Sequence, residues 1–239
     1  MRNEYRIALA GNPNTGKSTL FNALTGLKQH TGNWAGKTVA LAKGSIAYKD
    51  DQFQLIDLPG TYSLFSNSKD EEVARNYIVF DKPDVTLVVL DATSLERNLN
   101  LALQVLEMTK NVVICINLID VAKEQGIHIN EQLLTNRLGV PVIKISARNK
   151  KGFPMLLDTI HRIVTGEIDC HPVQMKYPQE IEEKIEQIEP KVREIVGDHV
   201  SSRWVSLRLL DGDKALIDEI KKYLSLKRED VNEYRTALQ

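Results

Sequence analysis

The octapeptide GNPNTGKS at residues 11–18 constrains the fold more than any other feature of this chain, because it matches the pattern G-x-x-x-x-G-K-[ST]. The β-rich run YRIALAG at 5–11 precedes it, and a helical pattern at 17–25 follows it. Such a turn between a strand and a helix presents successive backbone N–H groups to phosphate oxygens, and the helix adds its positive end. The sequence therefore predicts a phosphate-binding loop within an α/β domain.

Short β-rich runs alternate with helix-sized segments over residues 1–165. The predicted strands are 5–11, 38–48, 53–60, 85–93, 111–117 and 140–146, and the predicted helices are 17–25, about 70–80, 98–109, 130–138 and 152–165. Continuous Val, Ile and Leu runs suit strands buried on both faces, and the alternation indicates a mostly parallel sheet. We predict six strands with helices on both faces of the sheet, in which 38–48 and 53–57 form an antiparallel hairpin at one edge.

The pattern changes after Gly166, and residues 177–239 contain no strand-like run. Apolar residues instead recur at helical spacing in three successive segments: Ile181, Ile185, Ile188, Val192 and Ile195, then Trp204, Leu207 and Leu210, then Leu216, Ile220 and Leu224. Pro190 falls inside the first segment and is expected to kink or divide that helix. We therefore predict an α/β domain over 1–168 and a small all-α domain over 173–239.

Composition and charge exclude several classes of protein. The 31 Lys and Arg residues balance 32 Asp and Glu without any basic block, so a nucleic-acid partner has no electrostatic support. No signal peptide is visible, and the apolar runs are far shorter than the ~20 residues of a membrane span, which predicts a soluble polypeptide. Cys115 and Cys170 form no C-x-x-C pair, which indicates a reduced, cytoplasmic setting. Cys170 and His171 are expected to be a solvated linker pair rather than a metal site.

Residues of the phosphate loop have distinct expected roles. Gly11 and Gly16 permit the tight turn, because glycine tolerates the backbone angles that such a turn requires. Lys17 is expected to place its ammonium group against the β- and γ-phosphates of a nucleotide, and the Ser18 hydroxyl is expected to bind Mg²⁺.

Two later segments complete the expected phosphate and magnesium site. Asp57 of the motif DLPG ends the third predicted strand and is placed to hold a water of the magnesium shell, while the Gly60 N–H can contact the γ-phosphate. The loop TGNWAGKT needs a hydroxyl that reaches Mg²⁺ only when the γ-phosphate is present. Thr38 is the preferred residue and Thr31 the alternative, while Trp34 is expected to anchor the loop.

The motifs NLID and SAR predict that the base is guanine. The Asp120 carboxylate can accept N–H bonds from guanine N1 and N2, whereas adenine would leave that charge unpaired. Asn117 is expected to tie the base loop to the phosphate loop, and Leu118 stands where Lys is usual but can still cover the base. The Ala147 N–H is an expected donor to guanine O6.

With these motifs in order, the sequence resembles the amino-terminal cytoplasmic GTPase region of the ferrous iron transport protein B (FeoB) family. The matching features are GNPNTGKSTLFNALTG, GNWAGKT, DLPGTYSL, DATSLERNL, NLID and RWVSLRLLDGD, which together cover essentially the whole chain. The resemblance implies a Ras-like GTPase domain, a helical spacer of the dissociation-inhibitor-like type, and a membrane domain for Fe²⁺ uptake in a longer protein at the cytoplasmic face of the inner membrane. Thr15 and Ala35 depart from the family pattern without removing a ligand.

The resemblance also supplies the expected ions and catalytic residues. Lys17, Asn14, Thr38 and Gly60 are the expected catalytic residues, and Mg²⁺ is held by Ser18 and Thr38, and by Asp57 through water. Asn14 is expected to ligate an activating K⁺. The complete set of expected nucleotide contacts is Gly11, Asn12, Pro13, Asn14, Thr15, Gly16, Lys17, Ser18, Thr19, Gly36, Lys37, Thr38, Asp57, Leu58, Pro59, Gly60, Asn117, Leu118, Asp120, Ser146, Ala147 and Arg148.

Hydrolysis is expected to be slow. Thr61 occupies the position of the glutamine that orients the attacking water in Ras and is too short for that task, and no arginine finger can be assigned in cis. An intrinsic rate on the order of 10⁻⁴ to 10⁻³ s⁻¹ follows if unassisted Ras is the guide. Asp70 and Glu71 either orient water indirectly or are solvated acids in the first turn of a helix.

Three functions are compatible with these motifs. The favoured one is a GTP-hydrolysing domain that couples nucleotide state to Fe²⁺ transport. A soluble GTPase of ribosome or tRNA maturation is the alternative, although such proteins usually append a basic RNA-binding module. A nucleotide-gated binding switch with incidental hydrolysis is the third. The chain ends at Gln239 before any hydrophobic span, so we expect a fragment of a longer protein. Oligomerisation is left open.

Overall fold

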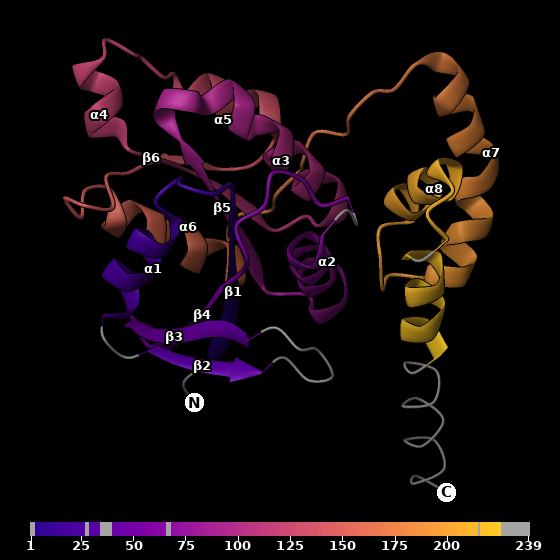
Figure 1. The fold of residues 1–239 in the computed structure, drawn as a ribbon, viewed down its shortest axis with the longest axis horizontal. Coiled ribbons are helices and arrows are strands. Elements are labelled where there is room, and N and C mark those ends of the chain that lie inside the picture. The colour runs from indigo at the N-terminus through magenta and orange to yellow at the C-terminus, as the bar shows by residue number, and fades with distance from the viewer. Residues whose placement is uncertain (1–2, 27–28, 34–39, 66–67, 215, 226–239) are drawn as a thin grey trace, which may run out of the picture. The chain divides into compact units, whose positions relative to one another are not determined.

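The contacts within the chain divide it into two units, Met1–Gln174 and Met175–Gln239. The computed structural model describes residues 3–26, 29–33, 40–65, 68–214 and 216–225. The first unit holds the sheet and the second is built from helices (Figure 1). Each unit is described by itself.

The first unit contains a sheet with the strand order β2-β3-β4-β1-β5-β6-β7. Its strands are β1 (Glu4–Gly11), β2 (Gln29–Asn33), β3 (Ala40–Tyr48), β4 (Asp51–Asp57), β5 (Val85–Asp91), β6 (Val112–Asn117) and β7 (Val142–Lys144). The pairs β1·β4, β1·β5, β5·β6 and β6·β7 are parallel, whereas β3·β4 and β2·β3 are antiparallel. The mostly parallel sheet with an antiparallel edge hairpin is therefore confirmed.

The strand β2 adds a seventh member to the six that the sequence predicts. Its sequence QHTGN is polar and contains a glycine, so it lacks the apolar run by which the other strands are predicted. Pairing with β3, from Gln29 opposite Gly44 to Asn33 opposite Ala40, makes it a strand. Edge strands are specified by such pairing more than by their own propensity.

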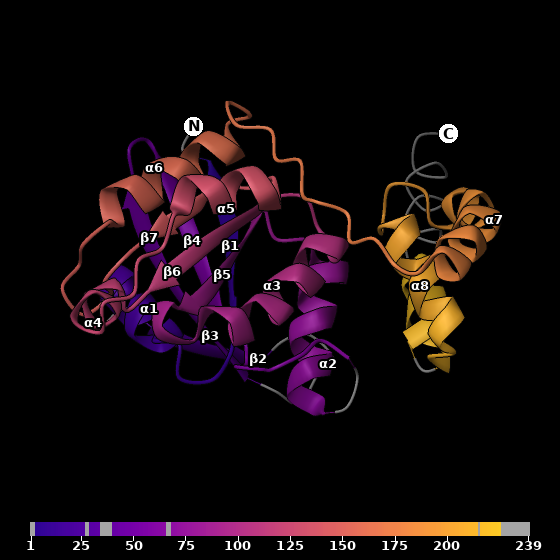
Figure 2. The ribbon, with the colours of Figure 1, turned by 90° about the horizontal axis from the view of Figure 1, so that it is seen from above.

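Helices surround the sheet (Figures 1 and 2). They are α1 (Lys17–Thr25), α2 (Lys69–Asn76) with the π-helical turn η1 (Tyr77–Asp81), the short turn η2 (Ala92–Ser94) leading into α3 (Leu95–Met108), α4 (Ile119–Glu124), α5 (Glu131–Leu138) and α6 (Phe153–Val164). Successive residues of a strand point to opposite faces of a sheet. All residues from Val85 to Leu90 and from Val112 to Asn117 are buried, so both faces of the sheet are covered at these strands.

The first unit extends beyond α6 to Gln174 because the following segment packs against the sheet domain. Cys170 is 3% exposed within the core, and the backbone N–H groups of His171 and Val173 donate to the carbonyls of Gly139 and Leu138. The expectation of a solvated Cys170-His171 pair is therefore wrong for the cysteine, and burial raises the pKa of the Cys170 thiol. His171 is exposed beside Asp169.

Over its described residues, the second unit contains α7 (Gln179–Val196), α8 (Ser202–Asp211) and a further helical stretch over 216–225. Pro190 was expected to kink or divide the first helix; it does not divide it, because α7 continues through it, and a kink there stays a prediction. Proline removes only one backbone donor, while the buried face of α7 packs on α8 and compensates for that loss. The buried side chains include Ile185, Val192, Val196, Trp204, Leu216 and Ile220, whereas Ile195 of the predicted stripe is exposed.

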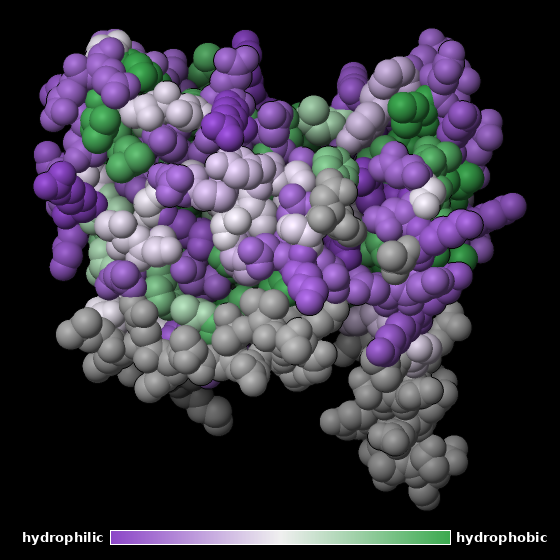
Figure 3. Space-filling model, viewed as in Figure 1, coloured by the Kyte–Doolittle hydropathy of each residue, from purple (hydrophilic) through white to green (hydrophobic). Residues whose placement is uncertain are grey.

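An arginine joins the start of α8 to the beginning of the helical unit. The Arg203 guanidinium donates to both carboxylate oxygens of Glu182, at 3.0 and 2.8 Å, and to the Met175 carbonyl at 2.9 Å. The hydrogen bonds from Arg203, together with the one from the Tyr177 N–H, hold the pKa of Glu182 below its usual range. No helix among the described residues combines the length and apolarity needed to cross a membrane. On the face in Figure 3, polar side chains predominate and apolar ones form separate patches.

Candidate nucleotide-binding site

The phosphate loop lies between the last residue of β1, Gly11, and the first residue of α1, Lys17. Asn14 and Gly16 both have positive φ, at 69° and 78°, which turns the chain sharply. A Cβ at Gly16 would overlap Asn117 Nδ2, and a Cβ at Gly11 would lie 2.6 Å from the Val89 carbonyl oxygen. Both glycines are therefore required by close approach of neighbouring elements.

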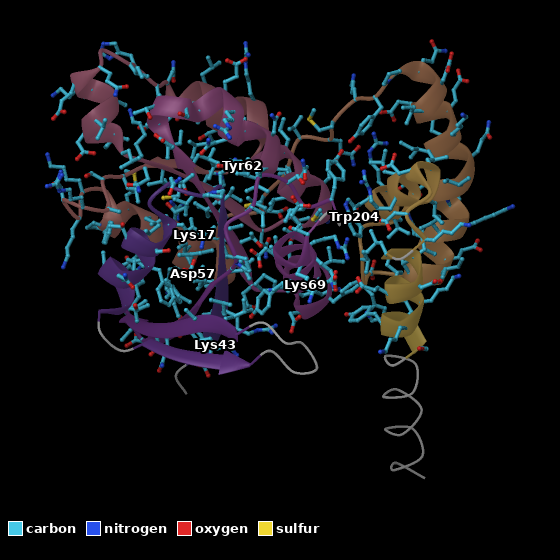
Figure 4. All side chains as sticks on the ribbon, in the orientation of Figure 1. Lys17, Lys43, Asp57, Tyr62, Lys69 and Trp204 are labelled. Carbon is cyan, nitrogen blue, oxygen red and sulfur yellow. The ribbon has the colours of Figure 1, made fainter. Side chains whose placement is uncertain are left out.

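Lys17, Ser18 and Asp57 converge at one end of the sheet (Figure 4 labels Lys17 and Asp57). The buried Lys17 ammonium forms an ion pair with Asp57 and donates to the Leu58 carbonyl at 2.6 Å. Ser18 Oγ lies 3.5 Å from the other Asp57 oxygen. The parallel pairing of β1 with β4 places Asp57 beside Leu9, next to the phosphate loop. A hydroxyl and a carboxylate together are hard oxygen ligands of the kind that Mg²⁺ prefers.

The remaining residues of the loop divide into buried and exposed ones. Thr15 is buried and its hydroxyl donates to the Asn12 carbonyl at 3.0 Å, which holds the turn from inside. Asn12 is also buried, and its Oδ1 has no hydrogen-bond partner among the described residues. Asn14, Ser18 and Thr19 are exposed, so their side chains remain accessible to a ligand.

The segment after DLPG is held against both the phosphate loop and α3. The Thr61 N–H donates to the Gly11 carbonyl at 3.2 Å, and the Thr61 side chain is only 5% exposed. The Leu64 N–H donates to Gln104 Oε1 at 2.7 Å. The Arg97 guanidinium lies 4.7 Å from the centre of the Tyr62 ring, within the range of a cation–π contact.

The sequence motifs did not identify Arg97 and Gln104 as contacts of this segment. Arg97 belongs to the run DATSLERNL, which also forms the turn between β5 and α3. Asp91 Oδ1 accepts from the Thr93 N–H and hydroxyl, and Asn98 Oδ1 accepts from the Asp91 N–H at 2.9 Å. This run is therefore structural at Asp91 and Asn98, and at Arg97 it faces the segment after DLPG.

Asp70 and Glu71 lie in the first turn of α2. The Ser68 hydroxyl caps this helix by accepting the Glu71 N–H at 3.2 Å. Acidic side chains at this end of a helix are stabilised by the unpaired N–H groups there. Both acids therefore lie where the interpretation as first-turn acids of a helix places them, and a role in orienting water stays a prediction.

Asn117 joins three loops, as the sequence predicts for its link to the phosphate loop. Its Nδ2 donates to the Thr15 carbonyl at 3.0 Å, and its Oδ1 accepts from the Ala147 N–H at 2.9 Å. All three groups are buried. Because the Ala147 N–H is engaged with Asn117 here, its donation to guanine O6 stays a prediction.

Asp120 has one carboxylate oxygen paired and one free among the described residues. Leu118, with φ 63°, turns the chain out of β6 so that Asp120 enters the first turn of α4. Asn149 Nδ2 donates to Asp120 Oδ2 at 2.8 Å, whereas Oδ1 is buried without a partner. A buried carboxylate oxygen without a donor is unfavourable, so this atom is suited to accept N–H groups of a ligand. Asn149 was missed from the sequence, although it directly follows SAR.

The other expected contacts fall into two groups. Leu58 and Ser146 are buried, and Pro13 and Pro59 are partly buried. Gly60 and Arg148, which follow β4 and β7 in the chain, are exposed. Trp34, Gly36, Lys37 and Thr38 lie outside the described residues, so the role of Thr38 is not tested. The backbone of the competing Thr31 pairs with Ala42 within β2 and β3.

Comparison with known proteins identifies the family of the chain. A family model described as ferrous iron transport protein B matches residues 5–160, and one described as the FeoB cytosolic helical domain matches residues 177–239. The chain belongs to the FeoB family. The Fe(2+) transporter FeoB of Methanocaldococcus jannaschii is 43% identical over 226 residues, which are 91% of this chain and 32% of that protein.

Further relatives agree with this assignment. FeoB of Escherichia coli K12 is 39% identical over 87% of this chain and 27% of its own length. The cytosolic domain of Thermotoga maritima FeoB in one GDP form has a TM-score of 0.84 at 35% identity, covering 93% of this chain and 86% of that one. The corresponding domain of Legionella pneumophila FeoB has a TM-score of 0.81 at 34% identity, covering 92% and 86%. The chain thus spans a third or less of the full-length relatives and most of their cytosolic domain.

Proposed function

We propose that this chain binds guanine nucleotides and hydrolyses GTP as the regulatory domain of a ferrous iron transporter. The observation that carries the proposal is the base site, where a buried Asp120 oxygen without a partner among the described residues lies beside the loops that Asn117 joins. Guanine presents two adjacent N–H groups to such a carboxylate, and adenine does not. The T. maritima relatives described as GDP and GMPPNP forms support the same ligand class.

The phosphate groups would lie over the loop from Gly11 to Ser18. Lys17 would then exchange its contact with Asp57 for the β- and γ-phosphates, which keeps its buried ammonium group paired throughout. The Gly60 N–H would donate to the γ-phosphate. The Lys17 ammonium and the Gly60 N–H would then be in position before the reaction. They would stabilise the negative charge that develops as the phosphoryl group is transferred.

Ser18 and Asp57 fit a magnesium ion, since a hydroxyl and a carboxylate oxygen lie 3.5 Å apart next to the phosphate loop. Bound there with a nucleotide, Mg²⁺ neutralises charge on the β- and γ-phosphate oxygens. Thr38 would add its hydroxyl when the γ-phosphate is present. We propose Asn14 as a ligand of K⁺, because its exposed side chain makes no hydrogen bond with another described residue and it stands beside the phosphates.

Thr61 does not orient the attacking water in this proposal. Its side chain is buried and its N–H is bonded to Gly11, so slow intrinsic hydrolysis is expected. The membrane domain of the full-length relatives would carry Fe²⁺, and this domain would act at the cytoplasmic face of the membrane. Membership of the FeoB family disfavours the alternative of a soluble GTPase of ribosome or tRNA maturation.

Guanine selectivity tests the proposal through Asp120→Asn. An amide at this position loses the two-acceptor carboxylate, so we expect GTP affinity to fall by about 100-fold or more. The affinity for xanthosine triphosphate should rise, because its C2 carbonyl suits an amide donor. Competition against a fluorescent GDP analogue measures the affinities for GTP and for xanthosine triphosphate. Asp158→Asn, an exposed carboxylate on α6 that pairs with Lys49, serves as the control. A variant at Asp120 that binds GTP like the parent would rule out this base site.

A further inference from the structure

Asn149 holds the carboxylate that is proposed to select guanine. Its Nδ2 donates to Asp120 Oδ2 at 2.8 Å, across 29 positions of sequence, from the loop after β7 to the first turn of α4. Asp120 Oδ1 is buried and accepts from no described residue. The two oxygens of this carboxylate are therefore in different environments, and the difference is made by one neutral amide.

The loop that carries Asn149 is itself closed by hydrogen bonds. The backbone groups of Ser146 and Lys151 pair in both directions, at 3.2 and 3.1 Å, and the Asn149 N–H lies 3.4 Å from Ser146 Oγ. Lys150, with φ 53°, completes the turn. Asn149 is thus presented to Asp120 from a short loop whose two ends are joined, rather than from a freely moving chain.

A fixed carboxylate plane matters for reading two N–H groups at once. An unconstrained Asp side chain rotates about its last torsion with little preference, and bidentate recognition requires both oxygens to be in register with the base. A carboxylate oxygen can accept two hydrogen bonds, so the bond from Asn149 leaves Oδ2 with capacity for a second donor. Oδ1 retains its full capacity.

We propose that Asn149 is a positioning residue for guanine specificity, which orients the Asp120 carboxylate so that it accepts from N1 and from the exocyclic N2 together. This inference rests on the proposed function, because it presupposes that Asp120 faces guanine. Without the amide donor, the carboxylate can still turn to accept the N1–H alone. The contact with N2 is therefore the one that Asn149 protects.

The test compares GDP with inosine diphosphate (IDP), which lacks the exocyclic amino group, on the full chain. The parent should prefer GDP. For Asn149→Ala we expect GDP to dissociate about tenfold faster or more, because one hydrogen bond to a charged group is lost, and the preference for GDP over IDP to fall about threefold or more. Asn149→Asp, which removes the donor and adds a like charge, should reduce the preference further, and Asn149→Gln should restore part of it.

The control is Asn136→Ala, an exposed asparagine of α5 that is bonded only to Gln132 among the described residues. It should match the parent in both measurements. An equal loss of GDP and IDP affinity in Asn149→Ala would overturn the inference. A residue that only stabilises the loop would lower the affinity for both nucleotides by the same factor. An unchanged preference would overturn it as well. A parent chain that binds neither nucleotide would contradict the proposed function itself and not this residue's role alone.

Discussion

At the scale of single residues, Lys17 and Asp120 have partners within the protein and can still bind a ligand. The Lys17 ammonium is buried and would be costly to leave without a partner, and its contacts with Asp57 and the Leu58 carbonyl satisfy it. The exchange of one anionic partner for another needs no change in burial. Asp120 is similar, because one carboxylate oxygen accepts a hydrogen bond from Asn149 and the other can accept one from a ligand.

Asn14 is expected to determine the response of hydrolysis to monovalent cations. Residues 61–68, which follow DLPG, contain no Lys or Arg to balance the charge between the β- and γ-phosphates, so a K⁺ ion held by the Asn14 amide oxygen would fill that role. GTP hydrolysis should be about tenfold faster or more in K⁺ than in Na⁺ at equal ionic strength. In Asn14→Ala the two salts should give the same rate, with little change in nucleotide affinity.

Phosphate release in matched KCl and NaCl buffers measures this effect, and Asn136→Ala should keep the parent's preference for K⁺. Equal rates of the parent in both salts would refute the role of Asn14. In that case the positive charge at the β,γ-bridge would have to come from another group.

The sequence predicted the residues of the site whose position follows from a motif next to a strand end. Asn117 and Asp57 are placed by the strands that precede them, so a local pattern is sufficient to locate them. Asn149 and Arg97 act across 29 and 35 positions, on Asp120 and Tyr62, and their roles depend on where two loops meet. Sequence spacing does not show which loops contact each other, and this is why Asn149 and Arg97 were missed.

At the scale of elements, the phosphate loop and the base loops behave as one assembly because Gly16 lies directly against Asn117. Gly16→Ala should impair both loops. We expect it to cost about 1–2 kcal/mol for the left-handed backbone and about another 1–3 kcal/mol as Asn117 Nδ2 is displaced from the Thr15 carbonyl. GDP affinity should fall in parallel.

Gly126→Ala is a matched control for this change. Gly126 has a similar φ of 73°, and a Cβ there would meet nothing within 4 Å. It should therefore show the backbone cost alone and bind GDP like the parent. Denaturant unfolding of the two variants and the parent gives the comparison, and equal losses of stability in both would mean that the contact with Asn117 contributes nothing.

Elements were predictable where apolar periodicity is strong and were missed where pairing or packing decides. The core strands β5 and β6 are continuous runs of buried apolar residues and were predicted from the sequence. The polar strand β2 forms only because β3 lies beside it. In α7 the packing against α8 outweighs the break that Pro190 alone predicts.

At the scale of the whole molecule, the boundary between the two units decides which fragments are stable. The sequence placed the end of the α/β domain at residue 168, whereas the first unit continues to Gln174. A fragment of residues 1–174 should fold and keep the guanine selectivity of the full chain. A fragment of residues 1–168 should lose about 2–4 kcal/mol, because it lacks the buried Cys170 and two backbone bonds to Gly139 and Leu138.

Thermal unfolding with and without GDP distinguishes the two fragments. Cys170→Ser in the longer fragment separates the contribution of the buried thiol from that of the backbone bonds. Loss of guanine selectivity in a folded 1–174 fragment would show that the helical unit takes part in nucleotide binding. Equal stability of the two fragments would mean that the α/β domain ends at residue 168.

The burial of Thr61 also bears on how this domain can evolve. A glutamine there would have to bury a longer side chain with three hydrogen-bonding groups beside Gly11, or push the whole segment away from the phosphate loop. Replacing Thr61 with glutamine is therefore a poor route to faster hydrolysis. Selection for faster turnover would act more readily on a partner that brings in positive charge, so the rate of hydrolysis can be set by a partner instead of by the core of this domain.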